Sequence, residues 1–94
     1  MASIGVLTLE LRLENSHSLK DKRHVVKSLR DRLRNKFNVS VAEIDCQDLW
    51  QRAVVAAVTV SSDKVQAERV LQSVEDETAS LLGPALAGAS VEWI

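Results

Sequence analysis

Residues 18–37 hold the groups in this chain that are best suited to bind an anion. The segment carries eight of the twelve Lys and Arg residues, although the whole chain has a formal net charge of −1. At about 100° per residue, five of these cations fall within one helical arc of roughly 80°. We call this arc the basic ridge; it consists of Lys20, Arg23, Lys27, Arg30 and Arg34.

Two hypotheses account for the basic ridge. Neighbouring like charges each cost a few tenths of a kcal/mol, and cations in the first turn oppose the helix dipole, so the arrangement needs compensation. Acids of the same chain can supply it, either Asp31 acting on Lys27 and Arg34, or acids of a second helix. These acids are Glu68, Glu75, Asp76 and Glu77. The other hypothesis is contact with phosphates, with RNA as the favoured source. The pI near 6.1 and the low aromatic content argue against sequence-specific recognition of bases.

Lys22 differs from the ridge because its helical angle places it inside the apolar stripe, between Leu19 and Val26. We expect its stem to pack on the core while the ammonium reaches past the helix start. The alternative is a cation held near the predicted hairpin by Asp48 or Glu43. There, Asp48 would cap the turn, and a cation–π contact would join Arg52 to Trp50. This candidate polar cluster consists of Lys22, Asp48, Trp50 and Arg52.

The sequence offers no metal-binding or catalytic motif. His17, His24 and Cys46 lack metal-ligand spacing, and the acids near the hairpin turn fit turn chemistry better than a cation site. No base stands near Cys46, and there is no glycine-rich phosphate loop. We therefore expect a non-enzymatic protein without a metal or cofactor; the alternative is an enzyme acting on an anionic substrate. That enzyme would use Lys22, Arg23 and Asp48.

The elements that position these groups are predicted from periodicity. Residues 5–14 alternate apolar and polar, which is typical of a half-buried strand. Ser18, with Asp21 three residues later, resembles a capping box and predicts a helix start. Apolar residues then recur at helical spacing as far as Phe37. They are Leu19, Val26, Leu29 and Leu33.

The second half of the chain predicts a hairpin, a helix and a closing strand. Residues 39–45 and 50–60 form the hairpin, with Asn38 taking an irregular backbone conformation before it and a polar turn around residues 46–48. Ser61, Ser62 and Asp63 compete to cap the second helix, which ends at Gly83. Residues 89–94 form a short last strand.

The resulting βαββαβ order predicts a ferredoxin-like α+β fold, with a four-stranded antiparallel sheet and both helices on one face. The stripe from Leu7 to Leu13 would meet the helices, and AVVAAV at 53–58 indicates a central strand covered on both sides. An apolar patch would then remain on the opposite face, where we expect a homodimer. The alternative is that Trp50 or Trp93 folds over it. The expected patch consists of Ile4, Val6, Ala53, Val55 and Ala57.

Length and composition predict one domain spanning residues 1–94, with 46% hydrophobic and 27% charged residues. The first residues lack the charged and apolar regions of a signal peptide, and no apolar run approaches membrane-spanning length. We therefore expect a cytoplasmic protein that does not enter a membrane. The single Cys46 excludes an internal disulfide.

Two blocks, SLKDKR at 18–23 and NVSVAEIDCQDLWQR at 38–52, resemble the YlxP-like family, a bacterial group of unknown function. The likeness extends to the closing Glu92 and Trp93. It implies a ferredoxin-like fold and no established catalytic residues. Members tend to be encoded beside translation genes, near initiation factor two and ribosome-binding factor A. This implies a factor that touches ribosomal RNA or a ribosomal particle through the basic ridge; the alternative is a dimeric protein- or effector-binding module using the sheet face or hairpin.

Overall fold

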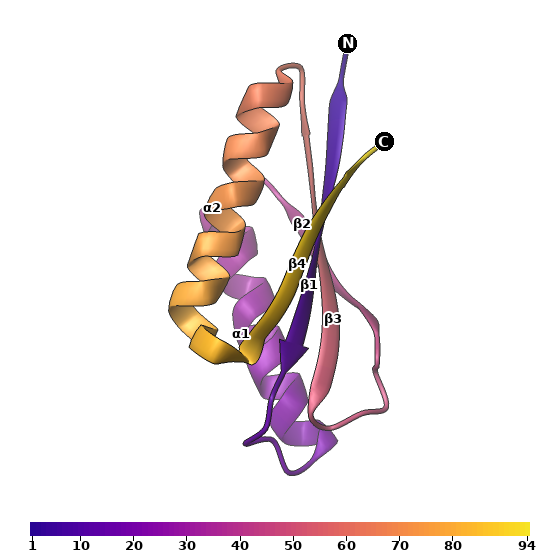
Figure 1. The fold of residues 1–94 in the computed structure, drawn as a ribbon, viewed down its shortest axis with the longest axis vertical. Helices are drawn as coiled ribbons and strands as arrows, with labels where there is room; N and C mark the ends of the chain where they lie inside the picture. The colour runs from indigo at the N-terminus through magenta and orange to yellow at the C-terminus, as the bar shows by residue number, and fades with distance from the viewer.

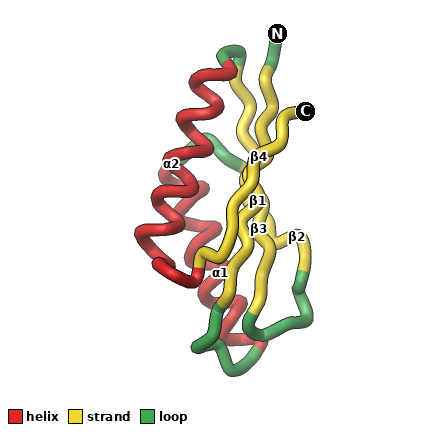
Figure 2. Tube along the Cα trace, in the orientation of Figure 1, coloured by secondary structure: helices red, strands yellow, loops and turns green.

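The computed structural model describes all 94 residues, as a four-stranded sheet with two helices packed on one of its faces (Figure 1 and Figure 2). The strands are antiparallel in the order β2-β3-β1-β4. This confirms the predicted ferredoxin-like fold, although the last strand begins earlier than residue 89. The elements are β1 (Ser3–Arg12), α1 (Leu19–Lys36), β2 (Ser40–Asp45), β3 (Arg52–Ser61), α2 (Lys64–Leu82), a 3-10 turn (Gly83–Ala85) and β4 (Leu86–Trp93).

Both helices begin at side-chain caps. The Ser18 hydroxyl accepts a hydrogen bond from the Asp21 amide at 3.0 Å, and the Asp21 carboxylate accepts one from the His17 amide at 3.0 Å. Asp63 caps α2 by accepting from the Val65 amide at 2.9 Å. A cap of this kind stabilises a helix by about 1 kcal/mol. The α2 helix ends where Gly83 adopts a positive φ of 55°.

The register of β1 and β3 decides which residues form the core. Leu7 pairs with Ala57, and Leu9 pairs with Val55. Directly opposed residues of an antiparallel pair share a face, so Ala57 and Val55 point to the helices together with the leucines. The expected patch was therefore wrong in Ala53, Val55 and Ala57, all of which are at most 1% exposed in the core. The opposite face carries their even-numbered neighbours instead, together with Ile4 and Val6.

Trp93 lies on the helix side of the sheet and not on the opposite face. It is paired with Gly5, where an added methyl group would lie 2.8 Å from Cζ3 of Trp93 and 2.7 Å from Cδ1 of Leu71. The Lys64 ammonium lies 5.0 Å from the centre of the Trp93 ring. The alternative in which Trp93 covers the opposite face is therefore wrong. Gly5 is small because α2 and the Trp93 ring occupy the space that a side chain would need.

Candidate functional site

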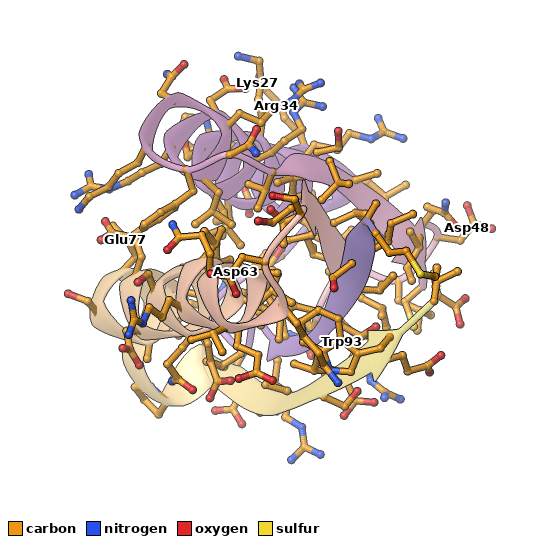
Figure 3. All side chains as sticks on the ribbon, turned by 90° about the horizontal axis from the view of Figure 1, so that it is seen from above. Lys27, Arg34, Asp48, Asp63, Glu77 and Trp93 are labelled. Atoms are coloured by element: carbon orange, nitrogen blue, oxygen red, sulfur yellow. The ribbon has the colours of Figure 1, made fainter.

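The α1 helix concentrates positive charge. Its eight basic and two acidic residues give it a formal charge of +6, while the rest of the chain, with four basic and eleven acidic residues, carries −7. Figure 3 shows Lys27 and Arg34 projecting from α1 on the side away from α2, while Glu77 lies between the two helices. Four of the five ridge cations are exposed to solvent, and Arg30 is partly buried.

Only part of the basic ridge is neutralised within the chain. Lys27 Nζ lies 3.0 Å from Asp31 Oδ2, and Arg30 Nε lies 3.5 Å from Asp31 Oδ1. The hydrogen bond from Lys27 lowers the pKa of the Asp31 carboxyl. Asp31 was expected to act on Lys27 and Arg34, so the prediction for Arg34 was wrong and Arg30 takes its place. The ridge residues without an ion pair are Lys20, Arg23 and Arg34, all exposed.

Glu77 neutralises two other cations of α1. Arg32 Nε donates to Glu77 Oε2 at 2.7 Å, and Lys36 Nζ donates to Glu77 Oε1 at 2.7 Å. These hydrogen bonds, first that from Lys36 and then that from Arg32, lower the pKa of the Glu77 carboxyl. Of the four acids considered on the second helix, Glu77 alone forms an ion pair. The contact joins the two helices and involves none of the ridge cations.

Glu77→Gln should lower the free energy of unfolding at neutral pH, and this difference from wild type should shrink in acid. A lowered folded-state pKa stabilises the fold above the unfolded value, ordinarily 4.5, and that stabilisation is lost as the pH falls through the folded-state pKa. Urea unfolding of both proteins between neutral pH and pH about 3 measures the difference. Glu68→Gln, at an exposed glutamate of the same helix without an ion pair, is the control. A difference for Glu77→Gln that stays constant with pH would contradict the assignment.

Lys22 is fully buried, and its ammonium is held at the end of the β2–β3 hairpin. Nζ donates hydrogen bonds to the backbone carbonyls of Cys46, Gln47 and Arg52 at 2.7, 3.1 and 3.3 Å. Glu43 Oε2 lies 2.9 Å from Nζ and balances the charge. The ammonium has three hydrogens, so the three carbonyls use all of them. The expectation that it reaches past the helix start was wrong, because the hairpin end closes over it.

The other members of the candidate polar cluster do not gather around Lys22. Arg52 contributes its carbonyl, whereas the Asp48 side chain is exposed and makes no hydrogen bond, and Figure 3 shows it far from Lys27 and Arg34. Trp50 is 53% exposed and makes no cation–π contact with Arg52. The residue with a left-handed backbone is Cys46, with φ of 62°, and not Asn38. The carbonyl partners of Lys22 could not be predicted from the sequence, because backbone carbonyls leave no side-chain pattern.

Two open pockets on the surface lie away from the basic ridge. An open pocket of about 820 Å³ lies between the end of β1, the start of α1 and the end of α2, and one of about 330 Å³ lies between α2 and β4. Neither is lined by a ridge cation, by Lys22 or by Asp48. No three His, Cys, Asp or Glu side chains are grouped so that they could hold a metal ion. The ridge thus lies outside both of these concave sites, which are the kind of site that encloses small molecules.

The fold and this surface define a small ferredoxin-like α+β protein with an exposed cationic helix. Neither of its helices combines the length and apolar character needed to cross a membrane. A family model described as "Protein of unknown function (DUF503)" matches residues 4–84, and the chain belongs to this family. It is 46% identical over 71 residues to the "Uncharacterized protein YlxP" of Bacillus subtilis (strain 168), covering 76% of this chain and 77% of that protein. The YlxP-like resemblance is thereby confirmed.

Solved structures support the fold alone. The de novo designed protein Foldit4 aligns with a TM-score of 0.55 at 16% identity, covering 100% of this chain and 94% of its own. The de novo designed protein LFR1 1 with ferredoxin fold aligns with a TM-score of 0.51 at 12% identity, covering 100% of this chain and 84% of its own. Similarity to designed proteins indicates a regular βαββαβ framework and carries no information on function.

Proposed function

We propose that this chain is a small, cytoplasmic, non-enzymatic factor that binds RNA, in particular ribosomal RNA, by contacting phosphates with the basic ridge. One observation carries the proposal. Glu77 neutralises the two exposed cations that face α2, while three ridge cations have no carboxylate partner. A structural role for the charges alone would have placed acids beside Lys20, Arg23 and Arg34 as well, whereas Asp31 pairs only with Lys27 and Arg30. Like charges along one helix destabilise it, so an outside anion is the compensation that remains.

The shape of the ridge favours a polymer over a small anion. From Lys20 to Arg34 the ridge extends along the helix for about 20 Å at 1.5 Å per residue. Neither of the two pockets described above encloses any part of it. Such a surface can follow a phosphate backbone and release its counterions without reading bases. Lys22 has no hydrogen left for a substrate anion, so the alternative of an enzyme using this residue receives no support from its contacts.

RNA binding is tested by charge reversal at the exposed start of the ridge. Lys20→Glu/Arg23→Glu should weaken binding to a short RNA duplex and to ribosomal subunits on the order of tenfold, because two phosphate contacts become repulsive. The same change should leave stability equal or higher, because acids near a helix N-terminus favour the dipole and a glutamate at 23 can pair with Lys27. Fluorescence anisotropy of the labelled duplex, co-sedimentation with ribosomal subunits and urea unfolding measure the three quantities.

The salt dependence adds a second criterion. For wild type, log affinity against log salt should have a slope of about −3 to −5, and the double variant should lose about 2 units of that slope. Lys64→Glu/Arg69→Glu is the matched control, because it also reverses two cations in the first turns of a helix and also changes the net charge from −1 to −5. Equal weakening of RNA binding by both double variants would show that net charge alone, and not the position of the ridge, causes the effect. Salt-insensitive binding, or none by wild type, would overturn the proposal.

A further inference from the structure

The face of the sheet opposite the helices is open and apolar at its centre. Figure 1 and Figure 2 show both helices on one side of the sheet and no element on the other. Even-numbered residues of β1 and β3 point to this side, since their odd-numbered neighbours pack under the helices. We call it the outer face; its apolar members include Ile4, Val6, Val54, Ala56, Val58 and Val60.

This composition is unusual for a solvated face. An antiparallel sheet with one wet side normally alternates, with polar residues outside. Every residue from Ala53 to Val58 is apolar, and Val60, further along the same strand, is 54% exposed. Trp93 does not cover the face, because it packs on the helix side, and Trp50 of the hairpin loop keeps 53% of its surface exposed. The chain therefore leaves the outer face for a partner.

Charged residues of opposite sign lie toward the two ends of the outer face. Arg12 and Arg52 are paired across β1 and β3 at one end, and Glu92 of β4 lies toward the other. Glu10 does not interrupt the centre, because its carboxylate lies over Gly88, where an added Cβ would be 2.9 Å from Oε2. The face consequently carries Arg12 and Arg52 at one end, with Glu10 and Asp45 one residue pair further in, a mainly apolar centre interrupted by Thr8, and Glu92 near its other end.

We propose that the outer face binds a second copy of this chain, with the strands of the two sheets antiparallel across the interface. This orientation turns Arg12 and Arg52 of each copy toward Glu92 of the other, and two-fold symmetry repeats the contact. The parallel orientation would stack Arg12 and Arg52 on the same residues of the second copy, which is repulsive. This inference does not depend on the RNA proposal.

The size of the outer face fits a modest interface. Four strands about 4.8 Å apart, with the lengths observed, cover roughly 500 Å² in projection. Two copies would then bury about 1,000 Å², which is the lower limit for a specific interface. We therefore expect a dimer that dissociates on dilution, and apolar packing of the valines with aligned sheets at its centre.

The first test is the oligomeric state of valine variants. By size-exclusion chromatography with light scattering across the micromolar range, wild type should reach twice the chain mass of 10.4 kDa. Val58→Lys, at the centre of the outer face, should be monomeric, while Val65→Lys, at a 53% exposed valine of α2, should remain dimeric. Circular dichroism verifies that each variant is folded. A monomeric wild type, or a dimer that survives Val58→Lys, would overturn the proposal.

The second test keeps the proposal open to refutation if Val58→Lys does not fold. Arg12→Glu and Glu92→Arg each place like charges at both symmetry-related contacts, so each should weaken dimerisation by several-fold. The double variant Arg12→Glu/Glu92→Arg exchanges the two charges and should restore it. Sedimentation velocity gives the dimer dissociation constant of each protein. Lack of any restoration would exclude the antiparallel arrangement.

Discussion

Lys22→Met is expected to lower the free energy of unfolding by about 3–5 kcal/mol. Methionine can replace the buried aliphatic stem, so the loss is that of the ammonium. Without it, the Gln47 and Arg52 carbonyls lose a donor, and the Glu43 carboxylate, only 16% exposed, loses its counter-charge. The Cys46 carbonyl keeps the Leu49 amide as a donor at 3.0 Å. Urea unfolding at one protein concentration measures the change.

Two further variants isolate the contribution of the buried ammonium. Lys27→Met, on a side chain that is 68% exposed, is the matched control and should change stability by about 0.5 kcal/mol at most. In Lys22→Met/Glu43→Gln no buried carboxylate is left without its partner, so the double variant should be more stable than the sum of the two single changes implies. Equal stability of Lys22→Met and Lys27→Met would contradict this prediction. It would mean that water can replace the ammonium at the hairpin end without any loss of stability.

Gly5→Val is expected to destabilise the fold by about 3 kcal/mol, and Gly5→Ala by about 1–3 kcal/mol. The backbone φ at Gly5 is not in the left-handed region, so the effect is steric. Even a methyl group would lie under 3.0 Å from atoms of both Leu71 and Trp93. Leu71 is 2% exposed and has little room to move, so the ring of Trp93 must be displaced from the edge of the core. Thermal and urea unfolding measure the loss.

Gly88→Ala is the matched control for Gly5→Ala, because both change a glycine within the same sheet. Its methyl group would meet the carboxylate of Glu10, the far end of an exposed and flexible side chain, so the effect should be within about 0.5 kcal/mol. Replacing the ring of Trp93 by a smaller side chain supplies a second check. In Gly5→Ala/Trp93→Leu the two losses should be less than additive. Additive losses would mean that the clash lies with Leu71 alone.

The element order was predictable because most boundaries have a local chemical signal, although the start of β4 was placed three residues too late. Alternation marks β1, the serine at 18 caps α1, and Gly83 ends α2, as expected from the sequence, while Asp63 is the one of three candidate residues that caps α2. The side of the sheet to which each β3 residue points was not predictable. Because AVVAAV is apolar at every position, it has no alternation, and only pairing with β1 determines the two faces. That is why three core residues were expected on the outer face.

The candidate site was likewise predictable only in part. The positions of the ridge cations follow from helical spacing, and the structure leaves all of them exposed except Arg30, which is partly buried. The position of Lys22 in the apolar stripe was also evident from spacing. Its partners were not, because three of the four are backbone carbonyls of a loop whose path depends on a left-handed cysteine. Side-chain patterns report faces of elements but not the course of a loop.

The separation of charge between α1 and the rest of the chain makes the molecule a strong electric dipole. The formal net charge of −1 suggests weak repulsion from any polyanion at long range. The charge of +6 on one helix, opposed by −7 elsewhere in the chain, nevertheless produces a torque on the molecule in an external electric field. Near a negatively charged surface the protein would rotate until α1 leads, and within about one Debye length, about 8 Å at physiological salt, the attraction of that helix exceeds the repulsion of the more distant acids. Orientation, and not net charge, then governs its encounter rate.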